Sequence, residues 1–296
     1  MKEYLTSQAL IQHTVLHGGK YSINHLISQG GFSFVYCAFD EINKNSVAIK
    51  EFFPDQYLFR DSDMAVVKPI RGKSIAKIQS YMSYFIEEGD IISRIKHSSV
   101  IKIIDSFFEN QTAYLVMKLI GGKSLSQQVE QSPYTYINQY KEVFELVSKL
   151  VDVLSDIHSK NICHLDISPD NILLDAYGEI VLIDFGSALV QFKKRKFQPI
   201  KHKYAPVETI KNKNIGIESD IFQLGMVIHE LLLGYLPPSA SKRISKMNKT
   251  GKDPLKLDNL IEPWQTLVSK AISLDRKDRP SSVDDLWSLV NCLTVD

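Results

Sequence analysis

The sequence predicts an α+β fold of two lobes, a β-rich N-lobe followed by a mainly α-helical C-lobe. Short strand-like runs separated by turn residues fill most of the chain up to Gly121 and Gly122, apolar residues recur at helical spacing after them, and 296 residues are enough for two cores. Two successive glycines resist ordering, so they mark the expected boundary. We expect an N-terminal extension at 1–20, the N-lobe at 21–120 and the C-lobe at 121–296.

The N-lobe is expected to contain five strands and one helix. β-Branched and aromatic residues concentrate in short runs bounded by glycine, asparagine and proline, which is typical of strands. Phe85, Ile92 and Ile95 recur at helical spacing, so a helix is expected over 81–95. The long segment 54–80 before it fits neither pattern and is treated as an insertion. The strands are expected at 21–27, 34–39, 46–52, 101–108 and 112–119.

The C-lobe is expected to consist mainly of helices. Apolar side chains from Val143 to Ile157 repeat at the spacing of one buried helix face, which predicts a long helix over 138–159. The same reasoning predicts further helices at 220–233, 260–273 and 281–293.

The composition is that of an ordinary globular protein. Hydrophobic residues make up 44% and charged residues 23%, which excludes a largely disordered or coiled-coil chain. The 35 lysines and arginines nearly balance the 34 aspartates and glutamates, so net charge gives no reason to expect nucleic-acid binding. Cys37, Cys163 and Cys292 are odd in number and far apart, which indicates neither a disulfide framework nor a metal site. We found no secretory signal and no apolar stretch long enough for a membrane span.

A glycine-rich turn and a lysine are the chemical candidates in the N-lobe. Residues 28–35 (Ser-Gln-Gly-Gly-Phe-Ser-Phe-Val) lie between the first two strands, where a Gly-Gly pair is first of all a hairpin turn. Lys50 lies in an otherwise apolar strand, where a buried charge needs a partner; the solvated face of an edge strand is the alternative. Glu88 on the predicted helix is the candidate counter-ion, and such a pair suits a lysine that holds phosphate.

Two segments of the C-lobe carry acidic and amide side chains. Residues 164–171 (His-Leu-Asp-Ile-Ser-Pro-Asp-Asn) place Asp166 and Asn171 in one loop, which suits a general base beside a metal ligand. Asp184 ends the apolar run 181–183 and suits a divalent cation, because such cations prefer oxygen ligands. Each feature alone also fits ordinary turn chemistry.

The order and spacing of these features together resemble the protein kinase signature set. That set combines a glycine-rich turn, Val-Ala-Ile-Lys at 47–50, a helix glutamate, His-x-Asp with its asparagine, and Asp-Phe-Gly at 184–186. Downstream, 204–208 (Tyr-Ala-Pro-Val-Glu) looks like the Ala-Pro-Glu element, and Arg279 looks like its arginine partner. The chain looks most similar to bacterial Ser/Thr kinases of the eukaryotic type over 21–293. This implies a bilobal protein kinase-like fold with one regulatory helix in the N-lobe.

The resemblance implies a function and a set of site residues. The protein would transfer the ATP γ-phosphoryl group to Ser or Thr hydroxyls of protein substrates, with Mg²⁺, or Mn²⁺ in its place, as the metal. Asp166 would accept the hydroxyl proton, assisted by Lys50 and Asn171 as the other catalytic residues, while Asn171 and Asp184 would hold the metal. The nucleotide-binding residues would be Ser28, Gly30, Gly31, Ser33, Val35, Ala48, Lys50, Glu88, Met117, Lys118, Ile120, Leu173 and Asp184.

Within this set, the implied roles differ. Lys50, paired with Glu88, would hold the α and β phosphates. Adenine would lie between Val35, Ala48 and Leu173. Met117 would occupy the gatekeeper position. The backbone of residues 118–120 would form hydrogen bonds with the edge of adenine.

The sequence departs from the family pattern at five positions. Ser28 and Ser33 replace glycines of the phosphate loop, and serine adopts unusual backbone geometry less readily. Leu165 replaces the arginine that would pair with a phosphorylated activation loop, so we expect no phosphorylation switch there. Ser168 replaces the lysine that Ser/Thr kinases place against the transferring phosphate, which predicts slow turnover. Lys201 or a neighbour occupies the region of a family threonine, so the acceptor class is less secure.

Two basic runs, 193–203 and 242–256, would flank the substrate-docking face and favour an acidic protein or an anionic cofactor, with a solvated surface as the alternative. They lack the interleaved aromatics of a nucleic-acid site. Two other functions stay open: a pseudokinase acting as a nucleotide-responsive binding module, and a small-molecule phosphotransferase. A cytoplasmic location is expected, with delivery into another cell as an effector left open.

Overall fold

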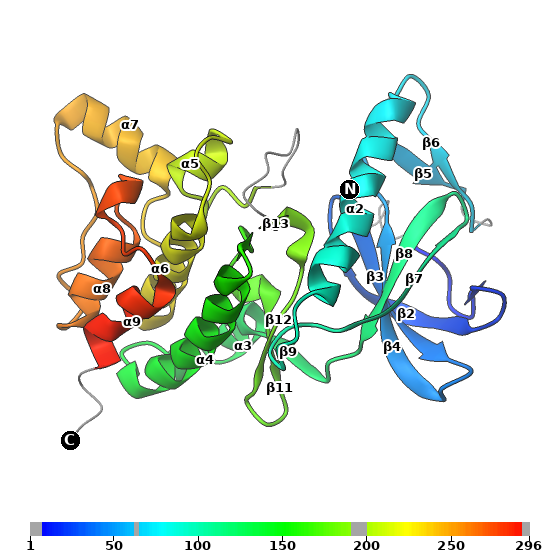
Figure 1. Ribbon diagram of the computed structural model, residues 1–296, viewed down its shortest axis with the longest axis horizontal. Helices are drawn as coiled ribbons and strands as arrows, with labels where there is room; N and C mark the ends of the chain where they lie inside the picture. Colours follow the sequence, from blue (N-terminus) through cyan, green and yellow to red (C-terminus); the bar gives the residue numbers. More distant parts are fainter. Residues whose placement is uncertain (1–7, 62–64, 191–199, 292–296) are drawn as a thin grey trace. The chain divides into compact units, whose positions relative to one another are not determined.

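The computed structural model describes residues 8–61, 65–190 and 200–291. A β-rich first part is followed by a mainly helical second part, which confirms the predicted α+β fold class. Figure 1 draws the strands of the first part in blue to green and the helices of the second part in green to red.

The chain divides into two compact units. Unit 1 comprises Met1–Arg94 and Ile101–Ile120, and unit 2 comprises Ile95–Val100 and Gly121–Asp296. Each unit has its own buried core, so each is described by itself.

Unit 1 is built on a six-stranded antiparallel sheet in the order β1-β2-β3-β4-β8-β7. The middle strands β4 and β8 are buried along most of their length, which explains their nearly continuous apolar sequences. The five predicted strands are confirmed, with ends shifted by a few residues. The bounds are β1 Val15–Leu16, β2 Tyr21–Gln29, β3 Ser33–Asp40, β4 Asn45–Phe52, β7 Ile103–Glu109 and β8 Thr112–Lys118.

The long helix in the described part of unit 1 is α2 (Ile75–Ser93), which contacts β7 and β8. It begins before the expected start at Tyr81, because its first turns carry few core side chains and therefore show little apolar periodicity: Ile75 is 52% exposed. A Cβ on Gly89 would stand 2.9 Å from Leu115 Cδ2, so glycine permits the close approach of α2 to β8.

The unassigned segment 54–80 contains a hairpin as well as the start of α2. Strands β5 (Leu58–Arg60) and β6 (Val67–Pro69) pair antiparallel. Arg60 is only 3% exposed, and its side chain forms a buried ion pair with Glu51 of β4. A buried ion pair therefore connects the hairpin to the main sheet.

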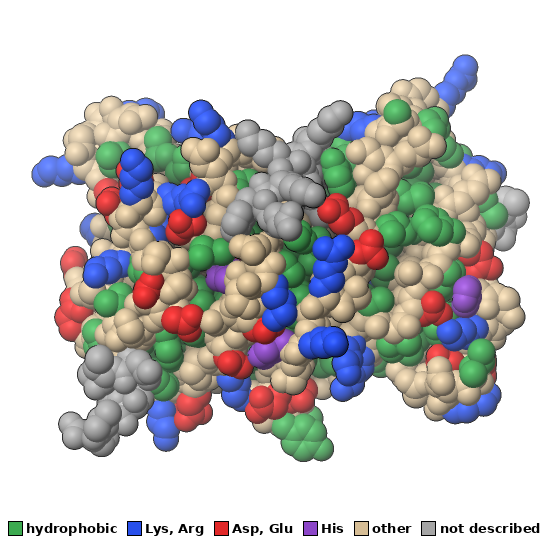
Figure 2. All heavy atoms as spheres, in the orientation of Figure 1, with side chains coloured by type: hydrophobic (Ala, Val, Ile, Leu, Met, Phe, Trp, Pro, Cys, Tyr) green, Lys and Arg blue, Asp and Glu red, His purple; other side chains and the backbone are tan. Residues whose placement is uncertain are grey.

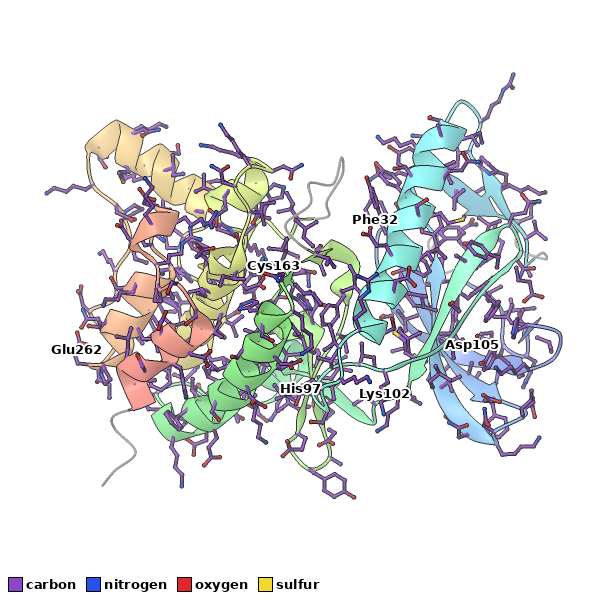
Figure 3. All side chains as sticks on the ribbon, in the orientation of Figure 1. Phe32, His97, Lys102, Asp105, Cys163 and Glu262 are labelled. Carbon is purple, nitrogen blue, oxygen red and sulfur yellow. The ribbon has the colours of Figure 1, made fainter. Side chains whose placement is uncertain are left out.

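Unit 2 is centred on α4 (Tyr140–Ser159) and α6 (Ile217–Leu233). One face of α4 is buried, as its periodicity predicts, whereas α6 is buried on nearly all sides. Strand β10 (Ile162–Cys163) contacts both helices, and its Cys163 is labelled in Figure 3.

The remaining helices of unit 2 confirm the predicted positions only in part. Helix α8 (Trp264–Ala271) starts later than expected, because Pro263 lacks an amide hydrogen and is suited only to a helix start. Helix α9 spans Val283–Asn291. Three helices were not predicted because they are short or lack an apolar stripe: α3 (Leu125–Gln131), α5 (Val207–Ile210) and α7 (Ala240–Thr250).

Small sheets complete unit 2. Strands β9 (Gly122–Ser124), β11 (Ile172–Asp175) and β12 (Ile180–Leu182) form one, and β10 pairs with β13 (Leu189–Val190) in another. A Cβ on Gly122 would stand 1.9 Å from the Leu174 carbonyl oxygen, so only glycine fits there. Gly122 is thus explained by the close approach of two backbones.

The surface carries charges of both signs. On the face drawn in Figure 2, Lys and Arg side chains are interspersed with Asp and Glu side chains, in keeping with a net charge of +1. Within the described ranges, no helix combines the length and the apolar character needed to cross a membrane.

Candidate active site

A buried ion pair joins β4 and α2 in unit 1. Lys50 Nζ lies 2.7 Å from Glu88 Oε1 and 2.8 Å from Glu88 Oε2, and the two residues are 7% and 2% exposed. Strand β4 lies between β3 and β8, so the alternative of an edge-strand lysine is excluded. A buried ammonium is stable here because the carboxylate compensates its lost hydration.

The glycine-rich turn connects β2 to β3. The Gly30 amide donates to the Ser33 carbonyl at 2.8 Å, and the Phe53 amide donates to the Phe32 carbonyl at 2.8 Å. Phe32, labelled in Figure 3, meets Tyr81 of α2 edge-on at 5.6 Å between ring centroids. A Cβ on Gly31 would meet no atom within 4 Å, so space remains beside this backbone.

The two serines of this turn adopt ordinary extended backbone. Ser28 pairs with Val35, next to a register shift between Leu26 and Ser28, and Ser33 pairs with Phe52. Neither serine has a positive φ. The structure therefore gives no backbone reason for a cost at these two positions.

The residues expected around adenine occupy both units. In unit 1, Ala48 of β4 pairs with Met117 of β8, and Val35 of β3 pairs with Lys50. The Lys118 amide donates to the Lys102 carbonyl at 3.0 Å. Met117, Leu119 and Ile120 are partly exposed and Lys118 is exposed. Leu173 belongs to β11 of unit 2, where it pairs with Val181.

Side chains of α6 form hydrogen bonds with the backbone of the loop that carries Asp166. Asp220 accepts hydrogen bonds from the His164 amide at 2.8 Å and the Leu165 amide at 2.7 Å. Gln223 accepts from the Ile167 amide at 3.0 Å and donates to the Leu165 carbonyl at 2.9 Å. Leu165 has a φ of 64°, an unfavourable value for leucine that these bonds hold in place.

Asp166 is held by Asn171 and retains one free oxygen. The Asn171 amide nitrogen donates to the Asp166 carbonyl and to Asp166 Oδ2, both at 2.8 Å. Asp166 Oδ1 is buried without a hydrogen-bond partner. Burial raises the pKa of Asp166 to about 7, although the ammonium of Lys201 opposes the shift and the carboxylate of Asp184 adds to it. The carboxyl is thus positioned and able to accept a proton near neutral pH.

Asp184 follows β12 and lies close to the same loop. It adopts a left-handed backbone with φ 60°, and its Oδ1 accepts from the Gly186 amide at 3.2 Å. The Ile183 amide donates to the Asn171 carbonyl at 3.0 Å, which ties the two candidate metal ligands together through backbone. The ring of Phe185 packs edge-on against His164 at 4.6 Å.

These donors fit Mg²⁺. Because the Asn171 nitrogen is engaged with Asp166, the amide oxygen is the remaining polar atom of that side chain, and Asp184 adds a carboxylate. The described residues contain no group of three or more His, Cys, Asp or Glu that could hold a metal. Mg²⁺ needs none, since it usually takes one or two carboxylates and completes its shell with water and substrate phosphates.

The Ala-Pro-Glu element and its arginine meet as the resemblance implies. Arg279 donates to Glu208 Oε1 at 2.6 Å and to Oε2 at 3.2 Å, and the arginine side chain is fully buried. Ser219 of α6 donates to the same Glu208 at 2.9 Å. The segment before α5 is therefore anchored to the core of unit 2.

The structure describes the second predicted basic run but only part of the first. Residues 193–196 of the first run lie outside the described residues. Arg243 of α7 does not contribute to the second run, because it is 2% exposed and its guanidinium binds Asp253 at 2.6 Å. Lys242, Lys246 and Lys249 of α7 are exposed.

Sequence reasoning missed two features near the site. One is the hydrogen bond of Lys201 to Ser168, which joins residues distant in the chain. The other is the buried contact of Arg60 with Glu51, beside Lys50. The sequence shows that residues 165 and 201 depart from the family pattern. Neither periodicity nor spacing, however, indicates which residues Leu165 and Lys201 contact.

Comparisons with known proteins agree with this geometry. A family model described as "Protein kinase domain" matches residues 56–288, a range that begins after the glycine-rich turn and Lys50. A serine/threonine-protein kinase PLK4 of Drosophila grimshawi is 29% identical over 237 residues, which are 78% of this chain and 28% of the relative. A probable serine/threonine-protein kinase PknB of Lactococcus lactis is 25% identical over 291 residues, 94% of this chain and 43% of the relative. The chain spans less than half of either relative.

A solved structure covers the remaining N-terminal elements. The chain titled "PpkA-294 apo form" superposes with a TM-score of 0.82 at 26% sequence identity, covering 96% of this chain and 100% of that one. The predicted kinase-like fold is thereby confirmed. With a family match over most of its length and the signature residues in place, the chain belongs to the protein kinase domain family.

Proposed function

We propose that this chain is an ATP-dependent protein kinase that phosphorylates Ser or Thr hydroxyls of protein substrates. The observation that carries the proposal is Asp166, a carboxyl that is 14% exposed and held by Asn171, with one buried, unpartnered oxygen. The relatives named serine/threonine-protein kinases support the acceptor class. The division into an extension at 1–20 and lobes at 21–120 and 121–296 remains part of this proposal.

Nucleotide binding would use the site residues that the resemblance implies. Lys50, paired with Glu88 and oriented by it, suits the α and β phosphates. The backbone of Gly30 and Gly31, flanked by Ser28 and Ser33, would lie along the phosphates. Val35, Ala48 and Leu173 would contact the adenine faces, with Met117, Lys118 and Ile120 at its edge.

The chemistry would take place at Asp166. Asp166 would accept a hydrogen bond from the acceptor hydroxyl, orient its oxygen towards the γ-phosphorus and take the proton during transfer. Asn171 and Asp184 would hold Mg²⁺, or Mn²⁺ in its place, and the bound metal would neutralise phosphate charge. The hydrogen bonds from α6 would keep the loop in position, so little reorganisation is needed.

The partner we propose is an acidic protein segment. Lys242, Lys246 and Lys249 lie on the exposed part of α7, and their charge would attract such a segment. We also keep the cytoplasm as the proposed location, in line with the two buried, free cysteines Cys37 and Cys163.

The test is phosphate transfer measured by mass spectrometry. The purified protein is incubated with Mg²⁺, ATP and acidic or basic acceptor proteins, beside an Asp166→Ala variant and an Asp258→Ala variant, whose carboxylate is exposed and lies outside this loop. We expect phosphate on Ser or Thr with the wild type and Asp258→Ala only. Phosphate on Tyr would overturn the acceptor class. ATP binding without transfer would favour the pseudokinase, and transfer only to small hydroxyl compounds would favour the small-molecule phosphotransferase.

A further inference from the structure

The catalytic loop lacks a cation of its own. Ser168 stands where Ser/Thr kinases usually carry the lysine that lies against the transferring phosphate. Its side chain is short, uncharged and fully buried, so it cannot supply the missing charge. From the sequence alone, this substitution predicts slow turnover.

An ammonium from another part of the chain occupies that neighbourhood. Lys201, 33 residues later, places Nζ 2.9 Å from Ser168 Oγ, 3.3 Å from Asp170 Oδ2 and 3.7 Å from Asp166 Oδ2. The backbone of Lys201 is fixed as well, because its carbonyl accepts from the Tyr204 amide at 3.0 Å and the Ala205 amide at 3.1 Å.

We propose that Lys201 supplies the phosphate-binding cation that position 168 lacks. The inference rests on the proposed function and adds a catalytic residue to it. The two positions would have exchanged roles: a hydroxyl now stands at 168 and the ammonium at 201, and they hydrogen-bond to each other. The cation therefore reaches the reacting groups from the segment before α5 instead of from the catalytic loop.

The geometry suits this role. An ammonium has three N–H donors, and Ser168 and Asp170 engage two of them, which leaves one for a phosphate oxygen. The Lys201 side chain is 35% exposed, so an incoming substrate can reach it. Asp166 and Asp170 face it from the catalytic loop and hold the positive charge beside the base.

The transfer step balances with Lys201 unchanged. The bond between the γ-phosphorus and the β–γ bridging oxygen of ATP breaks, that oxygen leaves with the electron pair as part of ADP, and the acceptor oxygen bonds to phosphorus. The hydroxyl proton passes to Asp166, while Lys201 remains protonated throughout. Its part is to hold a γ-phosphate oxygen and the negative charge that spreads over the phosphoryl group.

The test compares kcat and KM for ATP in matched variants of the full chain. Lys201→Met removes the cation, Lys201→Arg keeps it, and Lys211→Met removes an exposed lysine at the end of α5 as the control. The exchange variant Ser168→Lys with Lys201→Thr returns each group to the usual position. We expect Lys201→Met to lose about 10–100-fold in kcat with little change in KM for ATP, and Lys211→Met to behave as wild type.

Rescue separates catalysis from a purely structural role. The exchange variant is expected to recover most of the lost kcat, which a lysine that only tethered the segment would not allow. Wild-type kcat in Lys201→Met would overturn the inference and leave the kinase intact. An exchange variant that keeps the wild-type melting temperature but has the same low kcat as Lys201→Met would also overturn the inference. If the exchange variant is unstable, Lys201→Arg decides, because a loss equal to that of Lys201→Met contradicts a need for the cation. A wild type without any transfer would refute the proposed function, and this inference with it.

Discussion

Replacing Arg60 by alanine should destabilise unit 1 far more than the loss of one surface charge. Glu51 is fully buried and accepts hydrogen bonds from three side chains: Arg60, Tyr36 at 2.7 Å and Tyr114 at 2.9 Å. Arg60 carries the only positive charge among these donors. Without it, the carboxylate stays buried with two neutral phenols.

The magnitude follows from the burial of both partners. Their side chains are 2% and 0% exposed, and breaking such a buried pair costs about 3–5 kcal/mol. For a protein of this size that loss lowers the melting temperature by about 6–20 °C. The control is Lys68→Ala on the same hairpin, whose ion pair with Asp61 is 42% and 44% exposed and is expected to contribute about 0–1 kcal/mol.

The effect should also depend on pH. Burial raises the pKa of Glu51 and Arg60 opposes that rise, so Arg60→Ala raises the pKa further. A raised pKa means that the folded state favours the protonated carboxyl. The cost of Arg60→Ala should therefore be smallest at low pH, where Glu51 is protonated in both folded proteins, and grow as pH rises from the folded pKa of the wild type towards the higher folded pKa of the variant.

Thermal and urea unfolding of wild type, Arg60→Ala and Lys68→Ala over a range of pH measure these quantities. The reasoning is refuted if Arg60→Ala costs no more than Lys68→Ala at neutral pH. It is also refuted if the cost increases as the pH falls.

Three further predictions concern activity. Glu88→Gln removes the charge that compensates buried Lys50 and should lower kcat/KM by about 10–100-fold, whereas Glu87→Gln, at the exposed neighbour, should not; steady-state kinetics measure both. Chelation of divalent cations should abolish phosphate transfer, and Mg²⁺ or Mn²⁺ should restore it; transfer that persists in excess chelator would contradict the roles of Asn171 and Asp184. Phosphatase treatment should leave the rate unchanged, because Leu165 cannot bind a phosphate; phosphosite mapping with activity assays would expose an essential site if one exists.

The sequence predicts the fold class, which the structure confirms, and a set of candidate site residues, because their signals are local. Lys50 stands out as one charge in an apolar strand, and Asp166 and Asn171 share one short loop. Contacts between distant residues left no such signal. Lys201 reaches Ser168 across 33 residues, and the start of α2 is hidden because its first turns face solvent.

The insertion shows why such contacts need a structure. Successive residues of a strand point to opposite faces of the sheet, so Lys50 and Glu51 carry opposite charges to opposite faces of β4. Each is buried and each is paired, Lys50 with Glu88 of α2 and Glu51 with Arg60 of the inserted hairpin. In the sequence, Glu51 is an acidic residue beside a candidate phosphate-binding lysine, and its burial is explained only by its ion pair with Arg60. The hairpin thus supplies the counter-ion that lets this strand lie in the middle of the sheet with a charge on each face, which is a reason to expect Arg60 and Glu51 to change together if either changes.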